Sequence, residues 1–68
     1  SDSDKHYQIL NITRNSSVED VKKSYRLLSK KYHPDRVSHL GDEFAKLASE
    51  KFQIINKAYE EIKKEKRF

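Results

Sequence analysis

Residues 16–35 of this chain read SSVEDVKKSYRLLSKKYHPD, and this stretch decides the fold. Its apolar side chains recur at steps of three and four, which places them on one face of a helix; they are Val18, Val21, Tyr25, Leu28 and Tyr32. Ser16 is followed three residues later by Glu19, the spacing of a capping box, and Asp20 also suits the positive first turn. The stretch therefore predicts an amphipathic helix over residues 17–32.

The tripeptide His33-Pro34-Asp35 ends this helix. Proline disfavours the α conformation in the residue before it and has no backbone N–H, so the helix should stop near Tyr32 or His33. The imidazole and the carboxylate are then held on a stiffened turn, which opens a loop over residues 33–41. Two polar side chains that flank a proline in this way form a pre-shaped surface that a partner protein can recognise.

Two further helices are predicted on either side of this stretch. Polar residues at the start of the chain offer N-caps for a short helix over residues 4–11. Asp42 can cap a longer helix over residues 42–64, whose apolar stripe comprises Phe44, Leu47, Ala48, Phe52, Ile55, Tyr59 and Ile62. We expect the two long helices to pack as an antiparallel pair with the short helix lying across it, which is an all-α fold.

The composition limits the classes of function. At 68 residues the chain is a single domain, residues 1–68, that buries only about 60% of its unfolded surface, so an enclosed active-site cavity has no room beside the core. The net charge of +4 favours an acidic partner, and the lack of cysteine excludes disulfides and cysteine-based zinc sites. No apolar run approaches the roughly 18 residues that span a bilayer. Because the chain begins at Ser1 without a methionine, we expect it to be excised from a longer protein.

One face of the helix predicted over residues 17–32 is basic. Its row at i, i+4 and i+8, with one bordering residue, comprises Lys22, Arg26, Lys30 and Lys23, and Tyr25 marks the border with the apolar stripe. Such a row is often only the solvated back of an amphipathic helix. Here no acidic residue lies between Asp20 and Asp35, so the positive potential is uncompensated and can steer an acidic partner toward the tripeptide.

These features together resemble a J domain, the module that defines DnaJ-type (Hsp40) co-chaperones. Three segments carry the resemblance, and they occur in the family's order. The first, His6-Tyr7-Gln8-Ile9-Leu10, is similar to the opening Tyr-x-x-Leu signature. The other two are Tyr32-His33-Pro34-Asp35-Arg36 and the segment KFQIINKAYE at residues 51–60. The glycine common after the first signature is replaced by Asn11, which also tolerates a left-handed φ.

The resemblance implies that the chain binds an Hsp70-type (DnaK-like) chaperone near the junction of its two domains and their linker, and stimulates its ATP hydrolysis and client capture. The residues that it places at the interface are Lys22, Lys23, Tyr25, Arg26, Lys30, His33, Pro34, Asp35 and Arg36. In that picture Asp35 engages an arginine of the partner, His33 supplies hydrogen bonding and packing, and Pro34 fixes their presentation. The module performs no chemistry itself, so we expect no catalytic residue, cofactor or metal.

Three departures from the family pattern stand out. Leu27 occupies a position where the family often has a basic residue, the stretch from His33 to Lys51 is longer than usual, and the family's fourth helix is reduced to residues 66–68 or absent. The longer loop resembles the J domain of membrane-anchored DnaJ-like proteins of the DjlA type. On that resemblance we expect a cytoplasmic, monomeric domain that makes no membrane contact itself, in a parent protein anchored to a membrane.

Two other classes of function fit the sequence less well. A dyad of His33 and Asp35, or a metal site with His6 and His39, lacks a nearby nucleophile and ligand spacing. A small basic helical domain that binds nucleic acid is the stronger alternative. A helix-turn-helix joins its helices by a turn of about 3–4 residues, whereas residues 33–41 form a longer connection here. Nucleic acid is therefore not the partner we expect.

Overall fold

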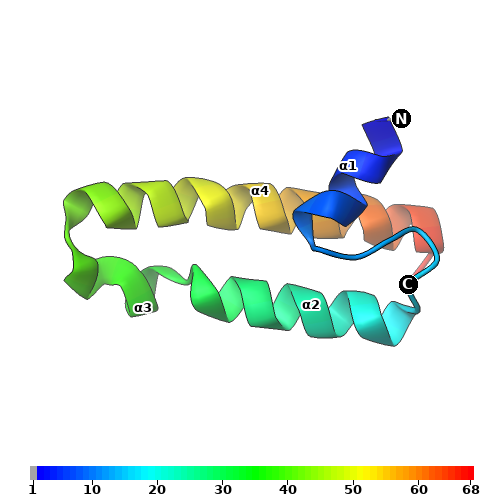
Figure 1. Cartoon of the computed structure of the whole chain (residues 1–68), viewed down its shortest axis with the longest axis horizontal. Coiled ribbons are helices and arrows are strands. Elements are labelled where there is room, and N and C mark those ends of the chain that lie inside the picture. The colour runs from blue at the N-terminus through cyan, green and yellow to red at the C-terminus, as the bar shows by residue number, and fades with distance from the viewer. Residues whose placement is uncertain (1) are drawn as a thin grey trace.

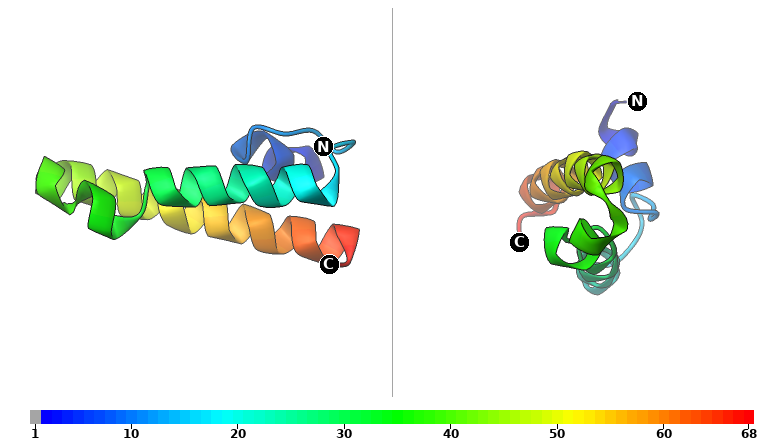
Figure 2. Two further views of the ribbon diagram at one scale, coloured as in Figure 1. Left: turned by 90° about the horizontal axis from the view of Figure 1, so that it is seen from below. Right: turned by 90° about the vertical axis from the view of Figure 1, so that its left-hand side faces the viewer.

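The computed structural model describes the backbone of residues 2–68 and the side chains of residues 4–68. Its elements are α1 (Asp2–Ile9), α2 (Val18–Lys31), α3 (Pro34–Val37), the 3-10 helix η1 (Ser38–Leu40) and α4 (Asp42–Lys66). Helices α2 and α4 run antiparallel, and α1 packs on the C-terminal half of α4 (Figure 1; Figure 2). No strand occurs among the described residues, so the predicted all-α fold is confirmed.

The N-cap of α2 is Ser17, one residue after the serine of the predicted capping box. Its hydroxyl oxygen accepts a hydrogen bond from the backbone N–H of Asp20 at 3.1 Å. The hydroxyl of Ser16 instead accepts one from the N–H of Thr13 at 3.1 Å and closes the preceding loop. Both serines have an acidic residue three positions later, so the sequence offers two registers, and the pairing of Ser16 with Glu19 was wrong.

The segment predicted as a loop over residues 33–41 contains the short helix α3 and the turn η1. Pro34 stops α2 because it lacks a backbone N–H and disfavours the α conformation at His33, which is extended. Its fixed φ nevertheless suits the first position of a new helix, where the missing N–H does no harm. Val37, in this segment, is buried. Gly41 then joins η1 to α4 with φ at +105°, a conformation that side chains disfavour. Asp42 is the first residue of α4 and not its cap, which corrects the prediction.

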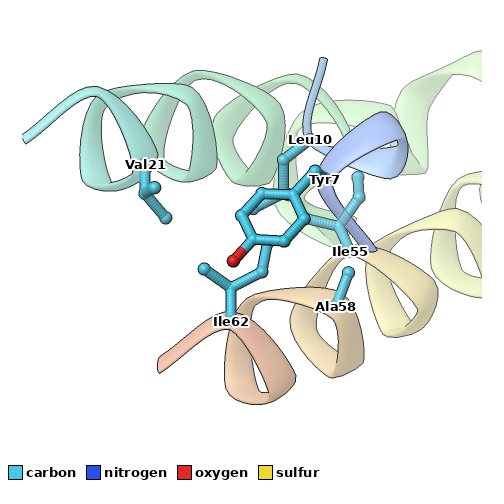
Figure 3. Packing of buried hydrophobic residues seen from close by; sticks show 6 residues of the cluster. All are labelled: Tyr7, Leu10, Val21, Ile55, Ala58 and Ile62. Atoms are coloured by element: carbon cyan, nitrogen blue, oxygen red, sulfur yellow. The ribbon is translucent and has the colours of Figure 1, made fainter. Parts of the chain in front are cut away.

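The main core lies where α1, α2 and the C-terminal half of α4 meet (Figure 3). Its buried side chains point toward one another and are Tyr7, Leu10, Val21, Ile55, Ala58 and Ile62. Several half-buried residues surround them, among them Leu28, Tyr59 and Phe68. The predicted stripes of the two long helices are thus confirmed at this end of the molecule, and residues 7 and 10 of the first signature complete the core.

The loop between α1 and α2 is fastened to both ends of the chain by Arg14. Its guanidinium donates to Asp4 Oδ1 at 3.0 Å and pairs with the carboxylate of Glu65, while Lys66 Nζ donates to its carbonyl oxygen at 3.0 Å. The hydrogen bond from Arg14 lowers the pKa of the Asp4 carboxyl. Asn11 adopts φ of +58° in the same loop, as predicted for the residue that replaces glycine.

The apolar stripe of α4 is not buried along its whole length. Phe44 and Leu47, predicted to lie on the packed stripe, are 64% and 63% exposed, which contradicts a core role. The reason is the difference in helix length, since 25 residues of α4 extend about 37 Å but 14 residues of α2 only about 21 Å. Beyond the end of α2, the described elements that pack on α4 are α3 and the short turn η1 (Figure 1).

Candidate partner-binding site

The tripeptide forms the first turn of α3. His33 is the N-cap with extended backbone (φ −63°, ψ 136°), and its ring nitrogen Nδ1 accepts a hydrogen bond from the N–H of Asp35 at 3.2 Å. Its carbonyl oxygen accepts from the N–H of Arg36 at 2.9 Å, and Pro34 occupies the first helical position. The conformation of the tripeptide is therefore fixed by its own hydrogen bonds.

This geometry sets which atoms of the tripeptide are offered to a partner. Because Nδ1 accepts a hydrogen bond, the proton of neutral His33 must lie on Nε2, which makes that atom a donor. The ring forms a T-shaped pair with Phe52 of α4, with ring centroids 5.6 Å apart and an interplanar angle of 76°. The side chain of Asp35 is 93% exposed and that of His33 49%. The distance of 3.8 Å from Nδ1 to Asp35 Oδ2 is too long for a hydrogen bond.

The basic face of α2 leads to this tripeptide. Lys23, Arg26 and Lys30 are exposed, and none of them forms an ion pair with a described residue. Lys22 lies at the far end of the row, roughly 12 Å along the helix axis from Lys30, and its ammonium group sits 5.6 Å from the centre of the Phe68 ring. Among the described residues, these three side chains of the predicted positive face therefore have no carboxylate within ion-pair distance, and Arg36 on α3 is exposed as well.

Tyr25 is placed differently from the other predicted interface residues. Its ring stacks on Tyr59 of α4 with centroids 3.9 Å apart, and its hydroxyl donates to Asn56 Oδ1 at 2.5 Å. Burial raises the pKa of this hydroxyl. These contacts give Tyr25 a packing role between the two long helices, and its role in binding a partner stays a prediction.

Other classes of site find little support in the described residues. Within residues 4–68, no three His, Asp or Glu side chains lie close enough together to hold a metal ion. His39 is exposed on η1 and His6 is half-buried on α1, so the two histidines weighed as metal ligands lie on different elements from His33. None of the described helices combines the length and the apolar character that crossing a bilayer requires.

Sequence reasoning missed an apolar groove beside the tripeptide. Its lining combines residues from α2, α3, η1 and α4, and comprises Lys31, Tyr32, Val37, Leu40, Phe44, Leu47, Ala48 and Lys51. The signal that could have revealed it is the pair Val37 and Leu40, two large apolar residues in a segment predicted as a polar loop. Tyr32 and Val37 bracket the tripeptide in the chain, so groove and tripeptide share one short segment.

The sequence matches the DnaJ domain family over residues 5–67. It is similar to proteins named chaperone protein DnaJ, with 48% identity over 62 residues in Helicobacter pylori and 49% over 55 residues in Campylobacter jejuni. The relative from Fusobacterium nucleatum subsp. polymorphum is 44% identical over 55 residues. These alignments cover 91%, 81% and 81% of this chain but only 15%, 13% and 14% of the respective relatives. No solved structure gives a significant match.

Proposed function

Because the chain belongs to the DnaJ domain family, we propose that it is a co-chaperone module that binds an Hsp70-type chaperone and stimulates its ATP hydrolysis and client capture. The observation that carries this proposal is the exposed tripeptide at the end of the basic face of α2, where the Asp35 carboxylate has no ionic partner closer than 3.8 Å among the side chains of residues 4–68. An exposed carboxylate on a fixed turn can accept a charge-assisted hydrogen bond from an arginine without first losing an internal one.

The residues around Asp35 would each have a different role in binding the partner. Lys23, Arg26 and Lys30 would steer the acidic surface of the partner, because uncompensated charge raises the rate of encounter more than the final affinity. His33 would hold the Asp35 backbone through Nδ1 and donate from Nε2 to the partner. Pro34 would keep both in place, since its φ is fixed.

The module would stimulate the chaperone without doing chemistry of its own. A binding protein shifts a two-state partner only by binding one state more tightly than the other. The tripeptide and basic face would therefore stabilise the state of the Hsp70 that hydrolyses ATP. We propose further that the domain acts as a monomer in the cytoplasm, without touching nucleic acid or membrane. The relatives carry only the general DnaJ name, so membrane anchoring of the DjlA type stays a prediction.

A single-turnover ATPase assay with purified Hsp70-type chaperone tests this function. The wild-type domain should accelerate hydrolysis, and Asp35→Asn should abolish the acceleration at every concentration, because the neutral amide cannot form an ion pair with an arginine and has only one acceptor oxygen. The stability of the variant should equal that of wild type, since no described side chain bonds to this carboxylate. Thermal unfolding followed by circular dichroism provides that control.

Two results would contradict the proposal. One is full stimulation by Asp35→Asn. The other is a wild-type domain that leaves ATP hydrolysis unchanged yet binds DNA or RNA at physiological salt, which would favour the nucleic-acid alternative that the net charge of +4 allows.

A further inference from the structure

The groove beside the tripeptide is an exposed apolar feature that the fold does not explain. It has a volume of about 360 Å³ and is walled by the end of α2, by α3 with η1, and by the N-terminal half of α4. Leu40, Phe44 and Leu47 are each more than half exposed along it, while Val37 and Ala48 are buried. Large apolar side chains gathered in this way mark interaction sites on small proteins.

The charged groups in the lining indicate what kind of partner fits. They are two lysines, Lys31 and Lys51, whose ammonium groups lie 5.5 and 5.9 Å from the centre of the Tyr32 ring. Small-ligand sites fix their ligand by several convergent polar groups of different kinds, which this lining lacks. Two exposed cations beside apolar walls instead suit an apolar protein segment with acidic residues next to it.

A second copy of the chain is a poorer occupant. The domain carries a net charge of +4, and lysines flank the groove, so two copies would bring like charges together. The acidic partner proposed for the tripeptide meets no such repulsion. Tyr32 and Val37 line the groove and flank the tripeptide in the chain, so a large partner that binds the tripeptide could also reach the groove.

We propose that the groove is a second docking surface for the same chaperone, which receives an apolar segment of that partner flanked by acidic residues. This inference rests on the proposed function. The two surfaces would differ in their effect: the tripeptide triggers hydrolysis, whereas the groove holds the complex together. Loss of the groove should therefore weaken binding but leave the response at saturation intact.

The double variant Phe44→Ala with Leu47→Ala separates the two effects. Both side chains are exposed, and alanine favours helix, so the fold should remain. In the single-turnover assay its half-saturating concentration should rise about tenfold, the scale expected when apolar anchors are removed from an interface, with the maximal rate unchanged. The matched control is Ile54→Ala, an exposed residue of α4 that does not line the groove. It borders the hollow beside α1 and a neighbouring hollow that shares Lys51 with the groove, and its truncation should leave both quantities unchanged.

A second variant tests the charge of the partner. Lys31→Gln with Lys51→Gln should raise the half-saturating concentration severalfold at low salt, and the difference should shrink at high salt because screening weakens exposed charges. An equal shift at both salt concentrations would refute the acidic character of the partner segment.

The remaining outcomes are also decisive. If wild type stimulates hydrolysis and the Phe44 and Leu47 variant keeps its half-saturating concentration, the groove inference fails while the proposed function stands. If sedimentation shows a wild-type dimer that this variant dissociates, the groove is a contact between copies and the inference is overturned. If wild type itself does not stimulate, the proposed function fails and the inference falls with it.

Discussion

The two ends of the α2–α4 pair carry the same apolar spacing and use it differently. At the closed end, where α1 covers the pair, Ile55 and Ile62 are fully buried against Tyr7 and Leu10. At the open end, formed by α3, η1 and the N-terminal half of α4, Phe44 stays largely exposed. Phe44 and Ile55 are eleven residues apart, about three helical turns, so both lie on nearly the same face of α4.

The difference shows that spacing selects a face, but the elements opposite decide whether that face is buried. The closed end has a third helix and the loop held by Arg14. At the open end, the described elements opposite α4 are a four-residue helix and a three-residue turn, and the buried residues there are Val37 of that helix and Ala48 of α4. Stability is thus concentrated at one end, which leaves the other free to present the tripeptide, the basic residues nearest to it and the groove.

Truncating one apolar residue at each end should show the difference in burial between the two ends most strongly. Ile55→Ala should lower the free energy of unfolding by about 2–5 kcal/mol, because it removes a fully buried side chain and leaves a cavity. Phe44→Ala should change it by roughly 0.5 kcal/mol or less, since the ring is mostly in water. Urea unfolding of both variants measures the contrast, and equal losses would show that the open end belongs to the core.

The adjacent serines before α2 offer a finer test at the closed end. Ser17→Ala should lower the free energy of unfolding by about 1 kcal/mol, because the N–H of Asp20 loses its capping partner. Ser16→Ala is the matched control and should cost roughly 0.5 kcal/mol or less, since its bond only closes an exposed loop. The reverse order in thermal or urea unfolding would restore the capping box at Ser16.

Most of the fold could be predicted from the sequence, because the signals involved are local. The range of α2 was predicted as 17–32 and is Val18–Lys31, and that of α4 was predicted as 42–64 and is Asp42–Lys66. The missing element was α3, since proline ends one helix and can also begin the next, and four residues show no periodicity. The turn at residues 33–35 was placed correctly, yet its capping by the His33 ring depends on a side-chain rotamer that sequence does not fix.

The groove could not be predicted for a different reason. Leu47 lies on a stripe that reads as core, and its exposure follows from where α2 ends in space relative to α4. That is a tertiary quantity, set by how far each helix extends past its neighbour. The stacking partner of Tyr25 could not be predicted for the same reason, because Tyr59 lies far from it in the chain.

Removing one charge from the basic face should have the smallest effect. Arg26→Ala should raise the half-saturating concentration for an Hsp70 about threefold at low salt and less at high salt, with stability unchanged, because the side chain is exposed and unpaired. Lys57→Ala removes the same charge from an exposed site beside α1 and should have no effect. Equal effects of the two variants would mean that net charge alone, and not the α2 face, attracts the partner.

The division between the two ends can be tested most directly by nuclear magnetic resonance. Unlabelled Hsp70 with ATP is added to the isotopically labelled domain, and the change in each amide signal is recorded. We predict changes at residues 23–40 and 44–51, with residues 7–13 and 58–66 unperturbed. Changes centred on α1 and the C-terminal half of α4 would contradict the account, because they would place the partner on the closed end.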